Sequence, residues 1–318
     1  MFKRGAAQEM IIFIPNNHGL GHYHRLLNIA NNLKSYTSKK IGFYLVDSFE
    51  AGLKNVFEKC NRNDLKSAEV IVIDSNDREF NQIELVDVNC ETIIWITDLQ
   101  INLSGKYSKI FAPFSSYSNN KIMNGLDYFV VQKYESSISQ APPKMVNTIG
   151  IYFGSVDETN NLFFILQKLD SLELFDRYNF NVMVGSRYEY RKYIDEYFYE
   201  GYPESIQFHD SNFHSIYEFL SLNDVFMGCC GNTSFEALHI GIPIINIVQN
   251  QLQFRNAQML QVRHGMPNMG FYPNDKAISE LFNEGIFEDL PFYSNLAKTI
   301  VDGRASDRIS TSILEELK

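Results

Sequence analysis

The stretch NNHGLGHYHR, residues 16–25, puts two glycines, three histidines and an arginine on one predicted turn between an apolar run and a segment of helical period. Glycines in such a turn let backbone N–H groups approach an anion closely, and the N-terminus of the following helix favours negative charge. The third glycine of the dinucleotide-binding fingerprint is missing, and His22 stands where that fingerprint has a simple spacer. We therefore expect Gly19 and Gly21 to help bind an anionic group that is not a dinucleotide.

The histidines of this stretch leave two other interpretations open. His18, His22 and His24 have side chains that bind metals, but no carboxylates flank them, and His24 should point away from His22 on the helix. The second alternative is an ordinary tight turn that carries surface histidines. We expect no metal ion here.

A second turn from strand to helix is predicted in GCCGNTSFEALHIGIP, residues 228–243. Small residues, hydroxyls and free amides at a helix N-terminus suit a pyrophosphate. Four residues supply these groups: Gly231, Asn232, Thr233 and Ser234. Glu236, further along the same helix, could accept hydrogen bonds from a ribose diol. The alternative is a helix that Thr233 or Ser234 simply caps, with Glu236 favouring the helix dipole.

Short β-branched runs alternate with longer segments of helical period, which is typical of a parallel α/β architecture. Strands are predicted at residues 10–15, 40–47, 68–75, 92–98, 108–114, 127–133, 147–155, 178–186, 204–210, 224–230 and 243–248. Helices are predicted at residues 24–33, 160–172, 214–222, 234–241 and 254–265.

Two consecutive prolines, Pro142 and Pro143, mark the expected linker, because proline lacks a backbone donor and restricts the residue before it. We therefore expect an N-terminal domain at residues 1–143 and a C-terminal domain at residues 144–318. Each should be Rossmann-like and doubly wound, with a cleft between the two. Such sheets bind ligands beyond the carboxyl ends of their strands, where both turns should lie.

Composition narrows the function classes. The formal net charge of −10 argues against nucleic-acid binding, which needs a basic surface. No apolar run approaches the ~20 residues of a membrane helix, and the first ten residues lack the apolar region of a signal peptide. The four cysteines show no zinc or disulfide spacing. We expect a cytoplasmic protein without a cofactor.

Five motifs in order along the chain resemble those of GT-B-fold nucleotide-sugar enzymes. They are GLGHYHR (19–25), FGSVDETN (153–160), CGNTSFEALHIGIP (230–243), NQLQFRNAQMLQVRHG (250–265) and VDGRASDRI (301–309). The first is similar to the G-x-G-H-x-x-R signature that also occurs in the peptidoglycan N-acetylglucosamine transferase. The other four are most similar to the UDP-sugar hydrolase of pseudaminic acid biosynthesis and its spore-coat polysaccharide relatives.

The resemblance implies a role for each matching residue. His22 would be the general base on water or on an acceptor hydroxyl, and Gly21 would leave room for the sugar or the diphosphate. The turn at residues 231–234 would hold the diphosphate, and Glu236 the ribose. Asn250 and Gln251 would face the sugar or the phosphates. Arg25 either contacts the substrate or makes a salt bridge on the helix surface or between domains.

The chain also departs from the hydrolase pattern. Asn76 in DSNDRE, residues 74–79, stands where the hydrolase has an active-site tyrosine, and an amide can bind a hydroxyl but cannot act as a phenolic acid or base. Ser155 replaces the second glycine of the turn after residue 153. These departures leave the acceptor open.

The resemblance implies metal-independent cleavage of the anomeric C–O bond of a UDP-amino sugar with inversion, in bacterial surface-glycan or nonulosonic-acid biosynthesis. Water as acceptor makes the protein a hydrolase. The alternatives are a glycosyltransferase that uses a glycan or a membrane-linked lipid acceptor, and a non-catalytic subunit that binds a nucleotide sugar.

Overall fold

The protein's structure is a computed structural model that describes residues 10–16, 20–45, 57–101, 106–132, 134, 144–210, 215–283 and 285–317. It forms two compact units. Unit 1 contains residues 1–133 and 303–318, and unit 2 contains residues 134–302.

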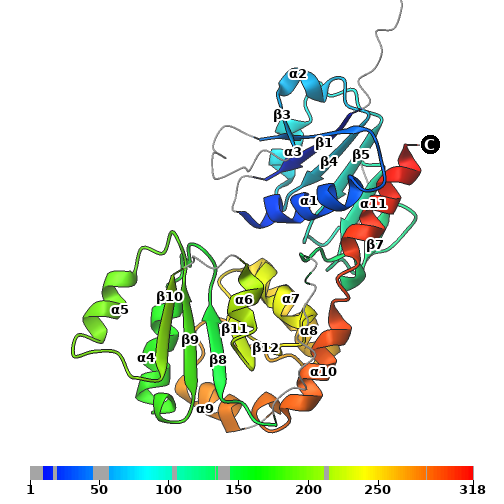
Figure 1. The fold of residues 1–318 in the computed structure, drawn as a ribbon. Coiled ribbons are helices and arrows are strands. Elements are labelled where there is room, and N and C mark those ends of the chain that lie inside the picture. Colours follow the sequence, from blue (N-terminus) through cyan, green and yellow to red (C-terminus); the bar gives the residue numbers. More distant parts are fainter. Residues whose placement is uncertain are drawn as a thin grey trace, which may run out of the picture. The chain divides into compact units, whose positions relative to one another are not determined.

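Unit 1 is built on a seven-stranded parallel sheet with the strand order β3-β2-β1-β4-β5-β6-β7 (Figure 1). Its strands are β1 Met10–Pro15, β2 Lys40–Tyr44, β3 Glu58–Cys60, β4 Val70–Asp74, β5 Thr92–Ile96, β6 Lys109–Ala112 and β7 Ile122–Asn124. Every residue of β1 and β4 is buried, as expected for parallel strands that are covered on both faces.

The helices of unit 1 are α1 Leu20–Leu33, α2 Arg62–Leu65, α3 Arg78–Glu84, the 3-10 helix η1 Leu126–Tyr128 and α11 Ala305–Glu316. α1 begins four residues earlier than predicted, so Gly21 and His22 lie in its first turn. The strand predicted at residues 127–133 is wrong. Residues 126–128 form η1 instead, and the apolar residues that follow are buried by packing, without a partner strand among the described residues.

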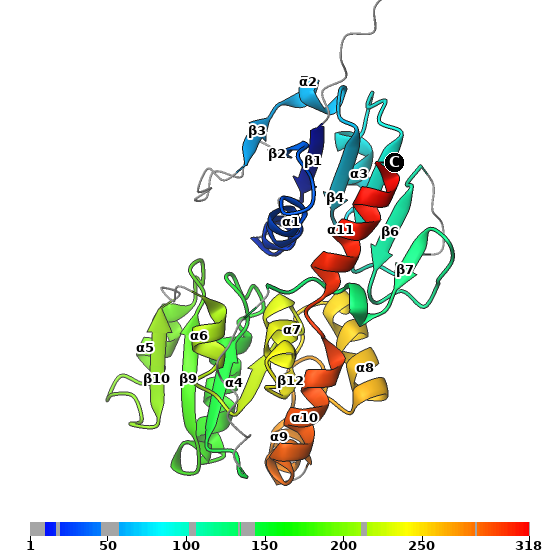
Figure 2. The same cartoon turned by 45° about the vertical axis from the view of Figure 1, so that its right-hand side comes forward.

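The last helix belongs to unit 1, which differs from the domain division expected from the sequence. α11 lies beside α1 (Figures 1 and 2), and its Ala305, Ile309 and Ile313 share one core with Leu26 and Ile29 of α1. The side-chain amide of Asn32 also donates to Asp307. Residues 303–318 therefore do not belong with residues 144–302.

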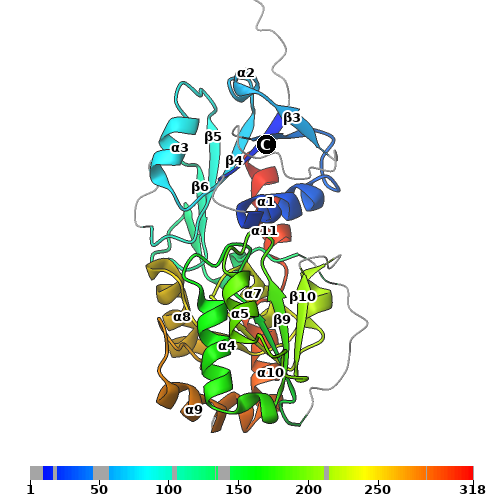
Figure 3. The same ribbon diagram turned by 90° about the vertical axis from the view of Figure 1, so that its left-hand side faces the viewer.

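Unit 2 has a five-stranded parallel sheet with the order β10-β9-β8-β11-β12. Its strands are β8 Thr148–Tyr152, β9 Asn179–Val184, β10 Ile206–Asp210, β11 Val225–Gly228 and β12 Ile244–Asn246. Its helices are α4 Asn161–Ser171, η2 Leu174–Asp176, α5 Arg191–Tyr197, α6 Ile216–Leu220, α7 Asn232–His239, α8 Gln251–His264, α9 Asp275–Asn283, η3 Gly285–Phe287 and α10 Leu290–Ile300. α4 covers one face of the sheet (Figure 3), where Ile165 packs in one core with Ile149 and Ile151.

In both sheets the order of the strands reverses between two neighbouring central strands, β1 and β4 in unit 1 and β8 and β11 in unit 2. Loops after two such strands leave toward opposite faces of the sheet, which opens a crevice at the carboxyl ends where ligands bind in doubly wound folds. The start of α1, which follows β1, and the turn after β11 both lie at such a point. No helix in the described part of the chain combines the length and apolarity that spanning a membrane requires.

Candidate active site

The first candidate site lies at the β1/β4 reversal of unit 1. The apolar face of α1, with Leu26, Ile29 and Leu33 fully buried, fixes the helix against the sheet. His22 and Arg25 are three residues apart, so they lie on the same side of this helix. Both side chains contact Asp74, the last residue of β4, whose side chain is completely buried.

His22 is paired with Asp74 through its Nδ1 atom, which lies 2.7 Å from Asp74 Oδ1. Arg25 Nη2 lies 3.0 Å from the same Nδ1, and because a guanidinium only donates, this contact is a hydrogen bond only when Nδ1 carries no hydrogen. Asp74 accepts from Arg25 through both carboxylate oxygens, and it also accepts from His22 when the hydrogen of the ring is on Nδ1. We assign the hydrogen of His22 to Nδ1, because the shorter of the two contacts is the one with the Asp74 carboxylate, and Nε2 is then unprotonated in the neutral imidazole.

Arg25 is a buried cation held by two carboxylates of its own unit. Its Nε donates to Asp74 Oδ2 at 2.9 Å and its Nη2 to Asp74 Oδ1 at 2.7 Å, while Nη1 donates to Asp98 Oδ1 at 2.6 Å. Burial lowers the pKa of Arg25, but the charges of Asp74 and Asp98 outweigh burial and raise it. The salt bridge foreseen for Arg25 exists, but it is buried inside unit 1.

Asp98 and Asn76 complete the cluster. Asp98 follows β5, and burial raises its pKa less than the charge and hydrogen bonds of Arg25 lower it, so the net pKa is lowered. Asn76 Nδ2 donates to Asp98 Oδ2 at 3.0 Å. Asn76 Oδ1 accepts from the Asp98 backbone N–H at 2.7 Å and from Thr97 Oγ1 at 3.1 Å. The amide predicted to meet substrate is therefore largely engaged with its neighbours.

The other histidines of the first motif do not join this cluster in the described residues. His24 is exposed on α1 and meets the edge of the Tyr23 ring. Among the residues that the structure describes, no group of three His, Cys, Asp or Glu side chains could hold a metal. His18 and Gly19 lie outside the described residues.

The second candidate site is the turn between β11 and α7 in unit 2. Gly231 is the N-cap of α7 and provides no side-chain hydrogen bond. The neighbouring helices are capped differently: Asp157 accepts from the first two backbone amides of α4, and Asn250 accepts from Gln253 N of α8. The N-terminal amides of α7 therefore have no side-chain cap at Gly231, and uncapped amides at a helix N-terminus can bind an anion.

The predicted residues of this turn differ in their accessibility. Asn232 and Thr233 are half-buried, whereas Ser234 is buried and its backbone N–H donates to Gly231 O. Gln251, the first residue of α8, is exposed. Asn250 Oδ1 is engaged as the cap of α8.

Glu236 lies on α7 and is a carboxyl without a described partner. No hydrogen bond or ion pair joins its side-chain carboxyl to a residue in the described part of the chain. Burial raises its pKa from 4.5 to about 7, and its charge contributes to raising the pKa of Tyr152 and Tyr217. A partly buried carboxyl with unused acceptor capacity is suited to bind a ligand hydroxyl.

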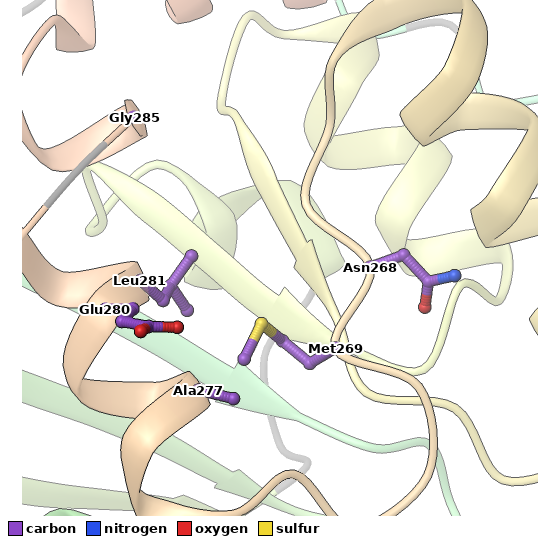
Figure 4. Close-up of a pocket in the computed structure, with 6 residues that line it drawn as sticks. All are labelled: Asn268, Met269, Ala277, Glu280, Leu281 and Gly285. Carbon is purple, nitrogen blue, oxygen red and sulfur yellow. The ribbon is translucent and has the colours of Figure 1, made fainter.

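An open hollow of about 410 Å³ lies elsewhere in unit 2 (Figure 4). It is lined by Asn268, Met269, Ala277, Glu280, Leu281 and Gly285. None of the residues singled out from the sequence lines it, and we assign it no function.

Two members of the unit 1 cluster, Asp74 and Asp98, received no role from the sequence. Each carboxylate stands at or just after the end of a strand, in VIVID and TIIWITD. Because these strands are adjacent and parallel, their carboxyl ends meet at the same edge. A carboxylate at the end of a strand was the sequence signal that could have identified Asp74 and Asp98. Which arginine pairs with them depends on how α1 packs on the sheet.

Comparison with known proteins identifies the fold. No family model matches the chain. An uncharacterised protein, MJ1062 of Methanocaldococcus jannaschii, is 28% identical over 268 residues, which are 74% of this chain and 54% of that protein. The chain thus spans about half the length of the curated relative that it matches.

Solved structures resemble the whole chain at low sequence identity. MurG of Acinetobacter baumannii has a TM-score of 0.64 at 9% identity, over 96% of this chain and 99% of its own. MnaA of S. aureus, solved with UDP, has a TM-score of 0.66 at 12% identity, over 97% of each chain. The two parallel-sheet α/β domains of this protein therefore have the GT-B glycosyltransferase fold, as its motifs predicted.

Proposed function

We propose that the protein cleaves the anomeric C–O bond of a UDP-amino sugar, with His22 as general base and inversion at the anomeric carbon. The observation that carries this proposal is the contact of His22 Nδ1 with the buried Asp74, which leaves Nε2 free to accept a proton. An imidazole that a carboxylate orients in this way is a typical catalytic base near neutral pH.

In this proposal, unit 2 binds the nucleotide part of the substrate. The α7 N-terminus at Gly231 and Asn232 meets the diphosphate with backbone amides, and Thr233 and Ser234 contribute beside them. Glu236 accepts hydrogen bonds from the ribose diol. Asn250 and Gln251 follow the next strand and face the sugar or the phosphates. MnaA, which shares the fold, binds UDP in its solved structure.

The bond changes of this reaction need only one base. His22 Nε2 takes a proton from water or an acceptor hydroxyl, whose oxygen forms the new bond to the anomeric carbon. The bond from that carbon to the diphosphate oxygen breaks, and UDP leaves with the electron pair. The α7 amides stabilise the charge that develops on UDP, so the step is proposed to need no metal.

Two acceptors fit this chemistry. Water makes the enzyme a hydrolase like that of pseudaminic acid biosynthesis, which the four similar motifs favour. A glycan or lipid hydroxyl makes it a glycosyltransferase, which is supported by Asn76, because an amide engaged with Asp98 does not replace the hydrolase tyrosine. A nucleotide-sugar-binding subunit would not require the His22–Asp74 pair.

The test is to incubate the protein with a panel of UDP-amino sugars, with and without cell-envelope acceptors, and to follow UDP by NMR. Free sugar alongside UDP identifies a hydrolase, and UDP released only with acceptor identifies a transferase. Absence of UDP release with every donor would refute the enzyme for that panel.

The base is tested by His22→Ala, with His24→Ala as the matched control on the same helix. We expect H22A to lower turnover by about 10²–10⁴-fold, as removal of a general base does, while UDP affinity stays unchanged. H24A should retain wild-type turnover, since its ring is exposed and outside the cluster. Equal activity of H22A and wild type would remove the role of His22.

A further inference from the structure

A continuous chain of polar contacts runs from Asn76 to the proposed base. Asn76 holds Asp98, Asp98 holds Arg25 Nη1, and Arg25 holds Asp74, which pairs with His22. Each of these contacts is 3.0 Å or shorter. The side chains of Asp74 and Arg25 are buried at 0% and 4% exposure, so neither is held in place by water.

The second carboxylate changes the charge of this cluster. Arg25 and Asp74 alone would form a neutral pair, but Asp98 brings the total to one net negative charge when His22 is neutral. A buried negative charge stabilises the imidazolium that forms when His22 takes a proton, because charges interact strongly where water is excluded. The reciprocal effect is present, since the charge of His22 contributes to lowering the pKa of Asp98.

Asp98 also determines where the guanidinium lies. With Nη1 bound to Asp98, the other edge of Arg25, Nε and Nη2, faces the two oxygens of Asp74 as a planar fork. This orientation presents Asp74 Oδ1 to His22 Nδ1. Asn76 in turn fixes Asp98 through both its backbone N–H and its carboxylate.

We propose that Asp98, clamped by Asn76, is a positioning residue that fixes the Arg25–Asp74–His22 relay and keeps a net negative charge beside the catalytic base. The inference rests on the proposed role of His22 in turnover. It gives Asn76 a defined task, which is to hold Asp98 at the place where the hydrolase has a tyrosine.

The first test reads the imidazole directly and needs no turnover. Long-range ¹H–¹⁵N spectra of the histidine rings separate the two tautomers, and the His22 signal is the one that H22A removes. We expect the Nδ1–H tautomer in the wild type. Asp98→Ala should give a mixture of tautomers, because Arg25 loses its contact with Asp98 and can shift together with Asp74. Asp98→Asn should fall between the two, because its Oδ1 still accepts from Arg25.

The second test uses the pH dependence of turnover. The charged groups that face His22 in the described residues of unit 1 are Asp74, Arg25 and Asp98. Removing the charge of Asp98 in D98N should move the acid limb of kcat downward by about one pH unit, the effect of one partly buried charge. The value of kcat should fall about 10–100-fold with little change in KM, a fraction of the effect of losing a general base.

Glu84→Gln is the matched control, because Glu84 makes another ion pair of unit 1, with Arg62, outside the relay. It should leave the His22 tautomer and the pH profile unchanged. Asn76→Ala releases Asp98 without removing a charge, so it should reduce kcat and mix the tautomers without shifting the acid limb. If D98A does not fold, the N76A variant still provides the tautomer and kcat measurements.

The outcomes separate the two proposals. If the wild type shows no turnover but D98A still changes the His22 tautomer, the proposed reaction is refuted and the relay is supported. If the wild type is active and the folded D98A and D98N variants keep its His22 tautomer, kcat and pH profile, Asp98 does not have the proposed role.

Discussion

At the scale of single residues, the buried cation Arg25 lies where carboxylates meet it. Arg25 is 3% exposed, and an unpaired charge at that depth would cost several kcal/mol. Each of its three guanidinium nitrogens donates to a carboxylate. One of these carboxylates, Asp74, also contacts His22, so the group that pairs with the buried Arg25 also orients the proposed base.

Glu236 is the contrasting residue, because burial acts on it without a partner. Its pKa rises from 4.5 to about 7, so between these values the folded protein keeps a proton that the unfolded chain has lost. Stability from this group is present below pH 4.5 and is lost as pH rises through about 7. The predicted loss is about 3 kcal/mol, from 1.36 kcal/mol per pKa unit.

Glu236→Gln should remove this dependence, because an amide does not titrate. Relative to the wild type, unit 2 of E236Q should therefore become more stable as the pH rises from about 5 to 8. Hydrogen exchange of unit 2 peptides across that range measures the difference. Parallel pH curves for the two proteins would contradict the raised pKa.

At the scale of elements, the starts of α4 and α7 in unit 2 are satisfied differently. Asp157 accepts from Asn161 N at 3.0 Å, Leu162 N at 2.8 Å and Gln249 Nε2 at 2.7 Å, so it satisfies the start of α4. In a sequence motif shared with nucleotide-sugar enzymes, this aspartate is thus a structural cap. The α7 N-terminus has no such cap.

Asp157→Ala should destabilise unit 2 by about 1–3 kcal/mol, because two backbone amides lose their acceptor and the half-buried amide of Gln249 loses one of its two. Asp157→Asn should lose less, since its Oδ1 still accepts a hydrogen bond. Faster hydrogen exchange of the first amides of α4 in D157A would show the loss of the cap. Unchanged exchange at Asn161 and Leu162 would refute the capping role.

At the scale of the whole molecule, the chain order and the compact units differ. Residues after 302 return to unit 1, where Ile309 and Ile313 are fully buried beside α1. α10, which directly precedes them in the sequence, instead contributes the buried Leu290 to the core of unit 2. The final two helices therefore stabilise different units.

Ile309→Ala should destabilise unit 1 by about 2–5 kcal/mol, the usual cost of truncating a buried aliphatic side chain. Trp95, the one tryptophan of the chain, is buried in unit 1, so its fluorescence reports that unit during urea unfolding. Leu290→Ala is the matched control and should speed hydrogen exchange in unit 2 without shifting the Trp95 midpoint. The reverse pattern would contradict the assignment of α11.

The sequence alone determined the fold class and the position of both candidate turns. Parallel α/β order follows from local periodicity, and each turn is a contiguous motif, so neither depends on distant residues. The strand predicted at residues 127–133 failed because an apolar run indicates burial but not pairing with a neighbouring strand.

Only the tertiary structure decided which side chains meet. His22, Arg25, Asp74 and Asp98 lie on α1, at the end of β4 and after β5, and the sheet order brings them within hydrogen-bond distance. It also decided that α11 packs on α1. Both depend on contacts between residues far apart in the chain, here from 49 residues for Arg25 and Asp74 to 275 for Asn32 and Asp307. Local pattern cannot specify such pairs, because an apolar helix face or a strand-end carboxylate fits many partners until the core selects one.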